Sequence, residues 1–338
     1  MNRKKVSVMA VLSAIAVFVL ILDAQTALNG ATAGVSLCIK SVIPSLFPLF
    51  FLCGILNSYL AGSSVKLLKP IGKLCGIPSG AESLYLIGIT GGYPVGAKCI
   101  YQSYNARVLR KEEAERLLGF CSNAGPAFLF GMTSLLFPNP AAPWLLWLIQ
   151  ILCALITGTI LPGKVTRFCA MTNQKDTGIA QALQSALHAI ASVCGWVIMF
   201  RVLLQFLDRW LLWLFPKEIS LLLTGILELS NGCIVLHEME NLPLRFIIAA
   251  VITVFGGICV CLQTISVCKV LSCRMYFVGK AIQTIICVPM AMIFSSFLFP
   301  GNNNYLYIGL IFGACSFLFC FLIIKSKICT GNPAVYRV

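Results

Sequence analysis

Two ionisable side chains, Lys98 and Glu228, lie inside long apolar stretches of the sequence. Each stands a few residues from helix-breaking glycines, in stretches at about 83–104 and about 218–240. The sequence predicts that Lys98 attracts an anionic substrate, and that Glu228 binds a coupling proton or sodium ion or hydrogen-bonds the substrate. The alternatives are an ion pair between these two residues, which would join the stretches, or a Lys98 side chain that extends to the membrane edge.

Hydrogen-bonding side chains accompany similar interruptions elsewhere. Ser122 and Asn123 precede Gly125, and Gln263 and Thr264 follow a pair of glycines. These groups line a substrate site, or they only satisfy backbone groups that the interruptions leave unpaired. The predicted substrate-binding residues are Gly91, Gly92, Tyr93, Pro94, Gly96, Lys98, Ser122, Asn123, Gly125, Glu228, Ser230, Asn231, Gly232, Gln263 and Thr264.

The composition identifies the solvent around these residues. Of the 338 residues, 59% are hydrophobic and 11% are charged, whereas soluble domains have about 45–50% apolar and about 25% charged residues. This excess of apolar side chains requires a lipid bilayer. We therefore expect an all-α integral membrane protein.

Apolar segments long enough to cross a bilayer recur along the chain. The stretches around Lys98 and Glu228 contain breakers in their middle, which predicts two re-entrant hairpins rather than two crossings. Breaks also fall inside two crossing segments, at residues 122–126 and at Gly256-Gly257. About eight transmembrane helices are predicted, at about 6–28, 35–60, 112–137, 142–162, 179–207, 243–270, 278–299 and 305–325.

The positions of the basic residues predict the orientation. The chain has 25 Lys and Arg against 11 Asp and Glu, a formal net charge of +14. If both hairpins return to the side from which they enter, 19 basic residues, Lys280 and Arg116 among them, fall on the side of the N-terminus. The positive-inside rule makes this side cytoplasmic, with both termini there. The net charge is explained by orientation, and no nucleic-acid partner is expected.

The order of the predicted elements repeats along the chain. In each half a membrane helix precedes a re-entrant hairpin, a broken helix and another membrane helix, at residues 1–165 and 166–338. The first hairpin enters from the cytoplasm and the second from outside, so the two repeats are predicted to be inverted. Inverted repeats with broken helices are typical of secondary transporters, whose substrate sites lie near the bilayer midplane.

Motifs for catalysis are weak. The segment from Gly91 to Lys98 resembles a phosphate-binding loop, but Ala97 occupies the position of the motif's lysine. The chain has two histidines, and its 17 cysteines lie mostly in apolar runs. We therefore expect no enzymatic activity, no cofactor and no metal site.

Several sequence blocks resemble a known family. They are Pro44-Ser45-Leu46-Phe47-Pro48, the segment 91–98, and Glu112-Glu113-Ala114-Glu115-Arg116 leading into Ser122-Asn123-Ala124-Gly125-Pro126. They are similar to the YlbJ-type sporulation integral membrane proteins, also called stage V sporulation protein V. That family is part of the nucleoside-recognition gate-domain group, which is related to concentrative nucleoside transporters. Glu228 with Ser230-Asn231-Gly232 resembles its second motif.

The resemblance implies a transporter of the outer forespore membrane, which moves dipicolinic acid out of the mother cell towards the developing spore. An aromatic dicarboxylate agrees with the anion site expected near Lys98. The alternatives are a nucleoside or another small carboxylate as the substrate, or a structural or signalling component of spore formation that transports nothing.

Overall fold

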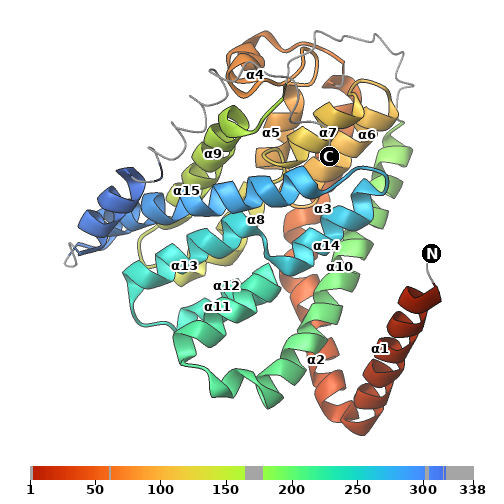
Figure 1. The fold of residues 1–338 in the computed structure, drawn as a ribbon, viewed down its shortest axis with the longest axis vertical. Coiled ribbons are helices and arrows are strands. Elements are labelled where there is room, and N and C mark those ends of the chain that lie inside the picture. Colours follow the sequence, from red (N-terminus) through yellow and green to blue (C-terminus); the bar gives the residue numbers. More distant parts are fainter. Residues whose placement is uncertain (1–2, 61, 164–177, 301–303, 315, 317–338) are drawn as a thin grey trace.

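The computed structural model describes residues 3–60, 62–163, 178–300, 304–314 and 316, and the regular elements in these ranges are all helices (Figure 1). Five helices are long and apolar enough to cross a membrane: Ala24–Leu60, Ala142–Ile160, Ile179–Trp210, Leu242–Cys268 and Arg274–Leu298. Shorter apolar helices are Ala10–Leu22, Pro126–Leu136 and Asn304–Ala314. The prediction of an α-helical membrane protein is confirmed. The predicted segment 305–325 lies mostly outside the described residues.

The N-terminal helices divide at a different place from the predicted one. Helix α1 (Arg3–Leu22) ends before Asp23, whose carboxylate accepts the N–H of Thr26 and caps α2 (Ala24–Leu37). Helix α2 continues through the π-helical turn η1 (Cys38–Val42) into α3 (Ile43–Leu60). The predicted end of the first helix at residue 28, and the gap before residue 35, were therefore wrong.

The long helix α10 (Ile179–Trp210) packs along α2 and α3 (Figure 1). Two glycines of α2 make this close approach. A Cβ atom added at Gly30 would lie 2.8 Å from the Cα of Val202, and one at Gly34 would lie 2.9 Å from the Cα of Ile198. The later glycine of α2 faces the earlier residue of α10, so these two helices are antiparallel. Small residues four positions apart commonly allow the backbones of two membrane helices to approach closely.

Adding one methyl group at Gly34 is expected to destabilise the protein. In Gly34→Ala the new Cβ would meet the backbone of α10, and such overpacking costs about 1–3 kcal/mol. Gly54→Ala on α3 is the matched control, because nothing lies within 4 Å of a Cβ there, and the better helix propensity of alanine should stabilise it by up to about 1 kcal/mol. We expect a lower Tm for the first variant only, measured on purified protein in detergent. Equal melting temperatures would contradict this packing.

The two stretches predicted to form re-entrant hairpins each contain a pair of packed helices, and these pairs are called hairpins below. The first consists of α5 (Ser83–Thr90) and α6 (Val95–Asn105), and the second of α11 (Lys217–Leu227) and α12 (Leu229–Val235). Within each hairpin the two helices meet at glycines. A Cβ atom at Gly96 would lie 3.1 Å from the Cα of Gly88, and one at Gly232 would lie 2.2 Å from the Cα of Gly225.

Two helices are interrupted where the sequence predicts breaks. Helix α7 (Lys111–Leu118) is followed, after an irregular segment, by α8 (Pro126–Thr133). Helix α13 (Leu242–Phe255) ends at Gly256, and α14 (Gly257–Cys268) follows at once. Gly256 has φ +90° and Gly257 has φ +80°, a backbone region in which side chains other than glycine are strained.

The remaining helices complete the core. Helix α9 (Ala142–Ile160) packs on α8 and on α15 (Arg274–Leu298), and α15 also contacts α7 and α13. Thus α15 touches the first half of each interrupted helix. Short elements connect the long ones: η2 (Lys66–Leu68), α4 (Lys69–Cys75), η3 (Ser134–Leu136), η4 (Leu212–Leu214) and η5 (Leu236–Glu238).

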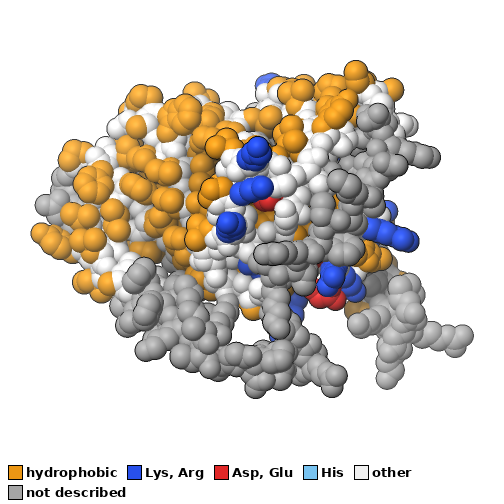
Figure 2. Space-filling view, turned by 90° about the horizontal axis from the view of Figure 1, so that it is seen from above, with side chains coloured by type: hydrophobic (Ala, Val, Ile, Leu, Met, Phe, Trp, Pro, Cys, Tyr) orange, Lys and Arg blue, Asp and Glu red, His pale blue; other side chains and the backbone are white. Residues whose placement is uncertain are grey.

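Several Lys and Arg side chains lie on the face drawn in Figure 2, which is seen from above Figure 1. Two residues of the predicted cytoplasmic set are buried instead, because Arg116 is 7% and Lys280 1% exposed. The Arg116 guanidinium donates to the carbonyl oxygens of Cys75, Gly76 and Gly158. The sequence count placed both residues on the predicted cytoplasmic side, and the structure shows in addition that both side chains are buried. Exposed basic residues of the joints are Lys66, Lys69, Lys73, Arg107, Arg110, Lys111, Lys269 and Arg274.

Candidate functional site

A fully buried lysine stands where the two interrupted helices meet the first hairpin. Lys280 lies in the second turn of α15, and its Nζ atom is 2.6 Å from the Tyr93 hydroxyl oxygen, 3.0 Å from the Val254 carbonyl oxygen and 3.0 Å from Gln283 Oε1. Three acceptors at these distances match the three hydrogens of an ammonium group. The Asn123 Oδ1 atom is a fourth neighbour at 3.4 Å.

The partners of Lys280 are all uncharged. The Tyr93 hydroxyl accepts from the lysine and donates to the Val254 carbonyl at 3.0 Å, and the ammonium also lies 4.8 Å from the centre of the Tyr93 ring. Ion pairs between described residues are Lys111–Glu115, Arg209–Asp23 and Lys217–Glu238. None of these includes Lys280, so in the described part of the chain the ammonium has no counter-ion.

The break in the second interrupted helix supplies the acceptor for both Tyr93 and Lys280. Because α13 ends at Phe255, the carbonyl of Val254 is not used by a continuing helix and accepts these side chains instead. A Cβ atom at Gly256 would lie 3.1 Å from Cζ of Tyr93. Glycine at this position therefore permits both the turn and the close approach of the tyrosine ring.

The first hairpin contacts the first interruption through its backbone. A Cβ atom at either Gly88 or Gly96 would lie 2.1 Å from the carbonyl oxygen of Cys121, and one at Gly125 would lie 2.8 Å from the N atom of Gly92. Gly91 is buried against the side chains of Cys53 and Val95. Side chains at these glycines would separate the first hairpin from the first interruption. Their absence allows Tyr93, at the turn of the hairpin, to reach the core.

Glu228 lies at the turn of the second hairpin and is 2% exposed. Its carboxylate accepts the N–H of Ser230 at 3.0 Å, the N–H of Asn231 at 2.7 Å and the Asn231 side-chain amide at 2.6 Å. The carboxylate thus caps α12 and neutralises the positive end of that helix. The backbone N–H groups of Ser230 and Asn231 at this helix end are therefore occupied by Glu228.

Two small cavities lie between these elements. One, of about 30 Å³, is lined by Tyr93, Gly125, Glu228, Ser230 and Gln263 among others. The second, also about 30 Å³, is lined by Pro94, Lys98 and Gln263 among others. Gln263 and Val193 line both. Each has room for one or two water molecules, so the site is closed in this conformation.

Lys98 and Glu228 do not form an ion pair. The Lys98 ammonium donates to the carbonyl oxygen of Ser185 on α10 at 2.8 Å. Lys98 therefore joins α6 to α10 and reaches the candidate site only as the wall of the second small cavity.

The other predicted polar residues differ in their hydrogen bonds and in whether they line the small cavities. Asn123 donates to the Phe120 carbonyl and accepts from Lys280. Ser122 is fully buried, and its hydroxyl has no hydrogen-bond partner among the described residues. Gln263 donates to the Cys259 sulfur and faces both cavities. Thr264 is fully buried but lines neither cavity.

Sequence reasoning missed Lys280 as a site residue. It lies within the predicted membrane segment 278–299 together with Gln283, which donates to the Gly119 carbonyl and holds α15 against the end of α7. Because Lys280 is close to Arg274 in the sequence, it was grouped with the basic residues of the predicted cytoplasmic side. A lysine and a glutamine three positions apart inside an apolar helix were the signal that could have identified it.

No group of three or more His, Cys, Asp or Glu side chains that could hold a metal ion occurs among the residues that the structure describes. The candidate site consists of hydrogen-bonding groups, one ammonium and one carboxylate. Such a set can bind and release a polar ligand by exchange of hydrogen bonds.

Comparison with known proteins connects the chain with one relative of known name. It is 23% identical over 346 residues to the sporulation integral membrane protein YlbJ of Bacillus subtilis (strain 168), and the match covers 87% of this chain and 84% of that protein. No family model and no solved structure matches the chain. The resemblance noted in the sequence is thereby confirmed.

Proposed function

We propose, from the premise that the chain is related to the YlbJ-type sporulation integral membrane proteins, that it is a multi-pass transporter of a small anionic metabolite. The first candidate substrate is dipicolinate, which the family resemblance implies. The observation that carries the proposal is Lys280, a buried ammonium with uncharged partners only among the described residues.

A charge in the middle of a membrane protein costs at least about 2.5–3.5 kcal/mol, and such residues usually serve a function. Hydrogen bonds to neutral groups offset part of that cost, but an anion offsets more because charge-assisted hydrogen bonds are roughly twice as strong. A substrate carboxylate can therefore replace Tyr93 and Gln283 as the partners of Lys280.

The order of elements supports an inverted-repeat architecture. We propose that α3, the hairpin α5–α6, the interrupted pair α7 and α8, and α9 correspond to α10, the hairpin α11–α12, the interrupted pair α13 and α14, and α15. Breaks and hairpin turns from both halves approach one another at Tyr93 and Val254. Secondary transporters bind substrate at such a junction.

Transport requires this closed centre to open. An aromatic dicarboxylate is several times larger than a water molecule, and cavities of about 30 Å³ do not hold it. We propose that the hairpin α5–α6 moves, which separates Tyr93 from Val254 and exposes Lys280 to substrate. Glu228 is the proposed site of a coupling proton or sodium ion, because it is a buried carboxylate on the wall of the same cavity.

The proposed location follows from the same family. We place the protein in the outer forespore membrane with both termini in the mother-cell cytoplasm, where the Lys and Arg side chains of the face drawn in Figure 2 would lie. The proposal includes no catalytic step and no cofactor.

Purified protein in proteoliposomes tests the proposed function. We expect saturable release of trapped dipicolinate that requires the protein, and no comparable release of uridine. Benzoate, which carries one carboxylate, is expected to compete more weakly than dipicolinate. Release of uridine without release of dipicolinate would support the nucleoside alternative and overturn the anion proposal. Release of neither, from protein that melts cooperatively, would support the structural alternative.

A further inference from the structure

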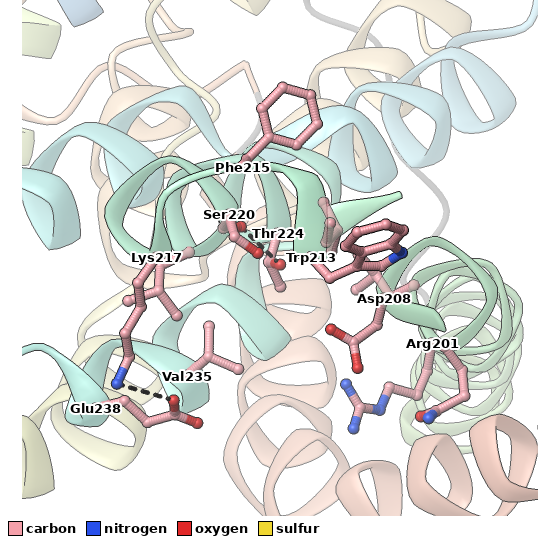
Figure 3. A pocket seen from close by; sticks show the side chains of 13 residues that line it. Arg201, Asp208, Trp213, Phe215, Lys217, Ser220, Thr224, Val235 and Glu238 are labelled. Atoms are coloured by element: carbon pink, nitrogen blue, oxygen red, sulfur yellow. Dashed lines mark hydrogen bonds and ion pairs between the residues drawn. The ribbon is translucent and has the colours of Figure 1, made fainter. Parts of the chain in front are cut away.

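A cavity of about 470 Å³ lies apart from the small cavities of the candidate site. It is bounded by the C-terminal half of α10, by η4 and by the hairpin α11–α12 (Figure 3). Its volume falls in the range of small-molecule sites, about 300–1,000 Å³. No residue that lines it lines either small cavity.

Two charged side chains of opposite sign line this cavity from one helix. Arg201 and Asp208 stand seven residues apart on α10, which places them on the same face two turns apart. Figure 3 shows the guanidinium and the carboxylate facing the same space. The structure records no hydrogen bond or ion pair for either side chain in the part of the chain it describes.

The other charges of the wall are satisfied. Lys217 at the start of α11 and Glu238 at the end of η5 form an ion pair of 3.5 Å (Figure 3). Of the charged side chains that line the cavity, Arg201 and Asp208 are therefore the two available to a ligand. An unpaired arginine in a membrane-spanning helix is costly and marks a functional site by default.

The rest of the wall is suited to an amphipathic molecule of small size. Apolar side chains of Leu204, Leu221 and Val235 line the cavity. The Ser220 hydroxyl makes no hydrogen bond to any residue that the structure describes, whereas the Thr224 hydroxyl donates to the Ser220 carbonyl at 3.0 Å. A bound molecule would thus find one free hydroxyl, one free charge of each sign and an apolar surface.

We propose that this cavity binds a small zwitterion of the amino-acid class. Arg201 holds the carboxylate through its fork of N–H donors, Asp208 holds the ammonium, and an apolar side chain contacts Leu204, Leu221 and Val235. A simple anion fits less well, because Asp208 would repel it. The proposal is independent of dipicolinate transport, since none of these residues belongs to the site around Lys280.

Three probes that differ by one charged group test the proposal on purified full-length protein. L-Leucine carries both charges, 4-methylpentanoate lacks the ammonium, and 3-methylbutylamine lacks the carboxylate. We expect saturable thermal stabilisation by L-leucine with a Kd of about 1 mM or lower. The two single-charge probes should bind at least about tenfold more weakly, because each loses a charge-assisted contact. No stabilisation by L-leucine, or equal stabilisation by 4-methylpentanoate, would overturn the proposal.

Two substitutions locate the ligand. Arg201→Gln and Asp208→Asn should each weaken binding of L-leucine at least about tenfold and leave the protein folded, because neither side chain has a partner to lose. Lys69→Gln on α4, at an exposed lysine that does not line the cavity, is the control and should leave binding unchanged. Binding that survives both cavity substitutions would contradict the assignment. Dipicolinate release by Arg201→Gln should equal that of the wild type, which separates this test from that of the proposed function.

Discussion

Lys280→Met is expected to lower dipicolinate transport by about 100-fold, the equivalent of one lost ammonium–carboxylate contact of about 3 kcal/mol. Methionine retains the length of the side chain and fills the same volume. The Tyr93 hydroxyl still donates to the Val254 carbonyl, so the first hairpin keeps its contact with the second interrupted helix. Loss of the charge removes the attraction for the substrate and leaves the fold.

The same variant separates a functional role of Lys280 from a structural one. Removal of the buried charge relieves a cost of at least about 2.5–3.5 kcal/mol, whereas the Gln283 amide oxygen loses its donor at a cost of about 1–3 kcal/mol. We therefore expect the Tm of Lys280→Met to equal or exceed that of the wild type. Lys73→Met, at an exposed lysine of α4, is the matched control for transport. Wild-type transport by Lys280→Met at equal protein amount would contradict the role of this residue.

Glu228→Gln is expected to abolish transport and also to destabilise the second hairpin. The carboxylate of Glu228 accepts from the backbone N–H of Ser230 and from both N–H groups of Asn231. A glutamine amide has one oxygen and one NH₂ group, so at least one buried donor loses its partner at a cost of about 1–3 kcal/mol. The coupling ion also loses its carboxylate. Transport and thermal unfolding of the purified variant measure the two effects.

Glu218→Gln is the matched control for this second prediction. Glu218 is an exposed carboxylate in the first turn of α11, in the same hairpin. Its removal should change stability by no more than about 0.5 kcal/mol and leave transport intact. If Glu228→Gln melts and transports as Glu218→Gln does, then Glu228 is neither the cap nor the coupling site that we describe.

The sequence predicted the hairpins and interruptions because backbone chemistry determines them locally. Glycines such as Gly256 and Gly257 adopt positive φ at little cost, and Pro126 begins a helix after an irregular segment. Hydrophobic segment length predicted the long helices for a similar reason. The boundary at Asp23 was missed because the apolar run continues past this residue, so that segment length alone does not locate the turn. The glycines that follow it, Gly30 and Gly34, pack α2 closely on α10.

The identity of the central cation depended on packing that the sequence does not specify. Lys98 and Lys280 each lie within an apolar stretch, and the sequence alone does not specify which of the two is enclosed. Lys98 finds the Ser185 carbonyl on α10, whereas Lys280 is enclosed by Tyr93, Val254 and Gln283. The difference arises because α15 crosses the interrupted helices, an arrangement that no local pattern specifies. The capping contacts of Glu228, by contrast, are local, because the backbone N–H groups that it accepts are two and three residues away.

Equilibrium binding of dipicolinate to purified wild-type protein and to Lys280→Met, by isothermal titration calorimetry, tests the central claim most directly. We predict saturable binding to the wild type and a Kd at least about 100-fold higher for Lys280→Met, with the two proteins equally stable to heat. Equal affinity of both proteins for dipicolinate would contradict the claim that this buried ammonium is the anion site.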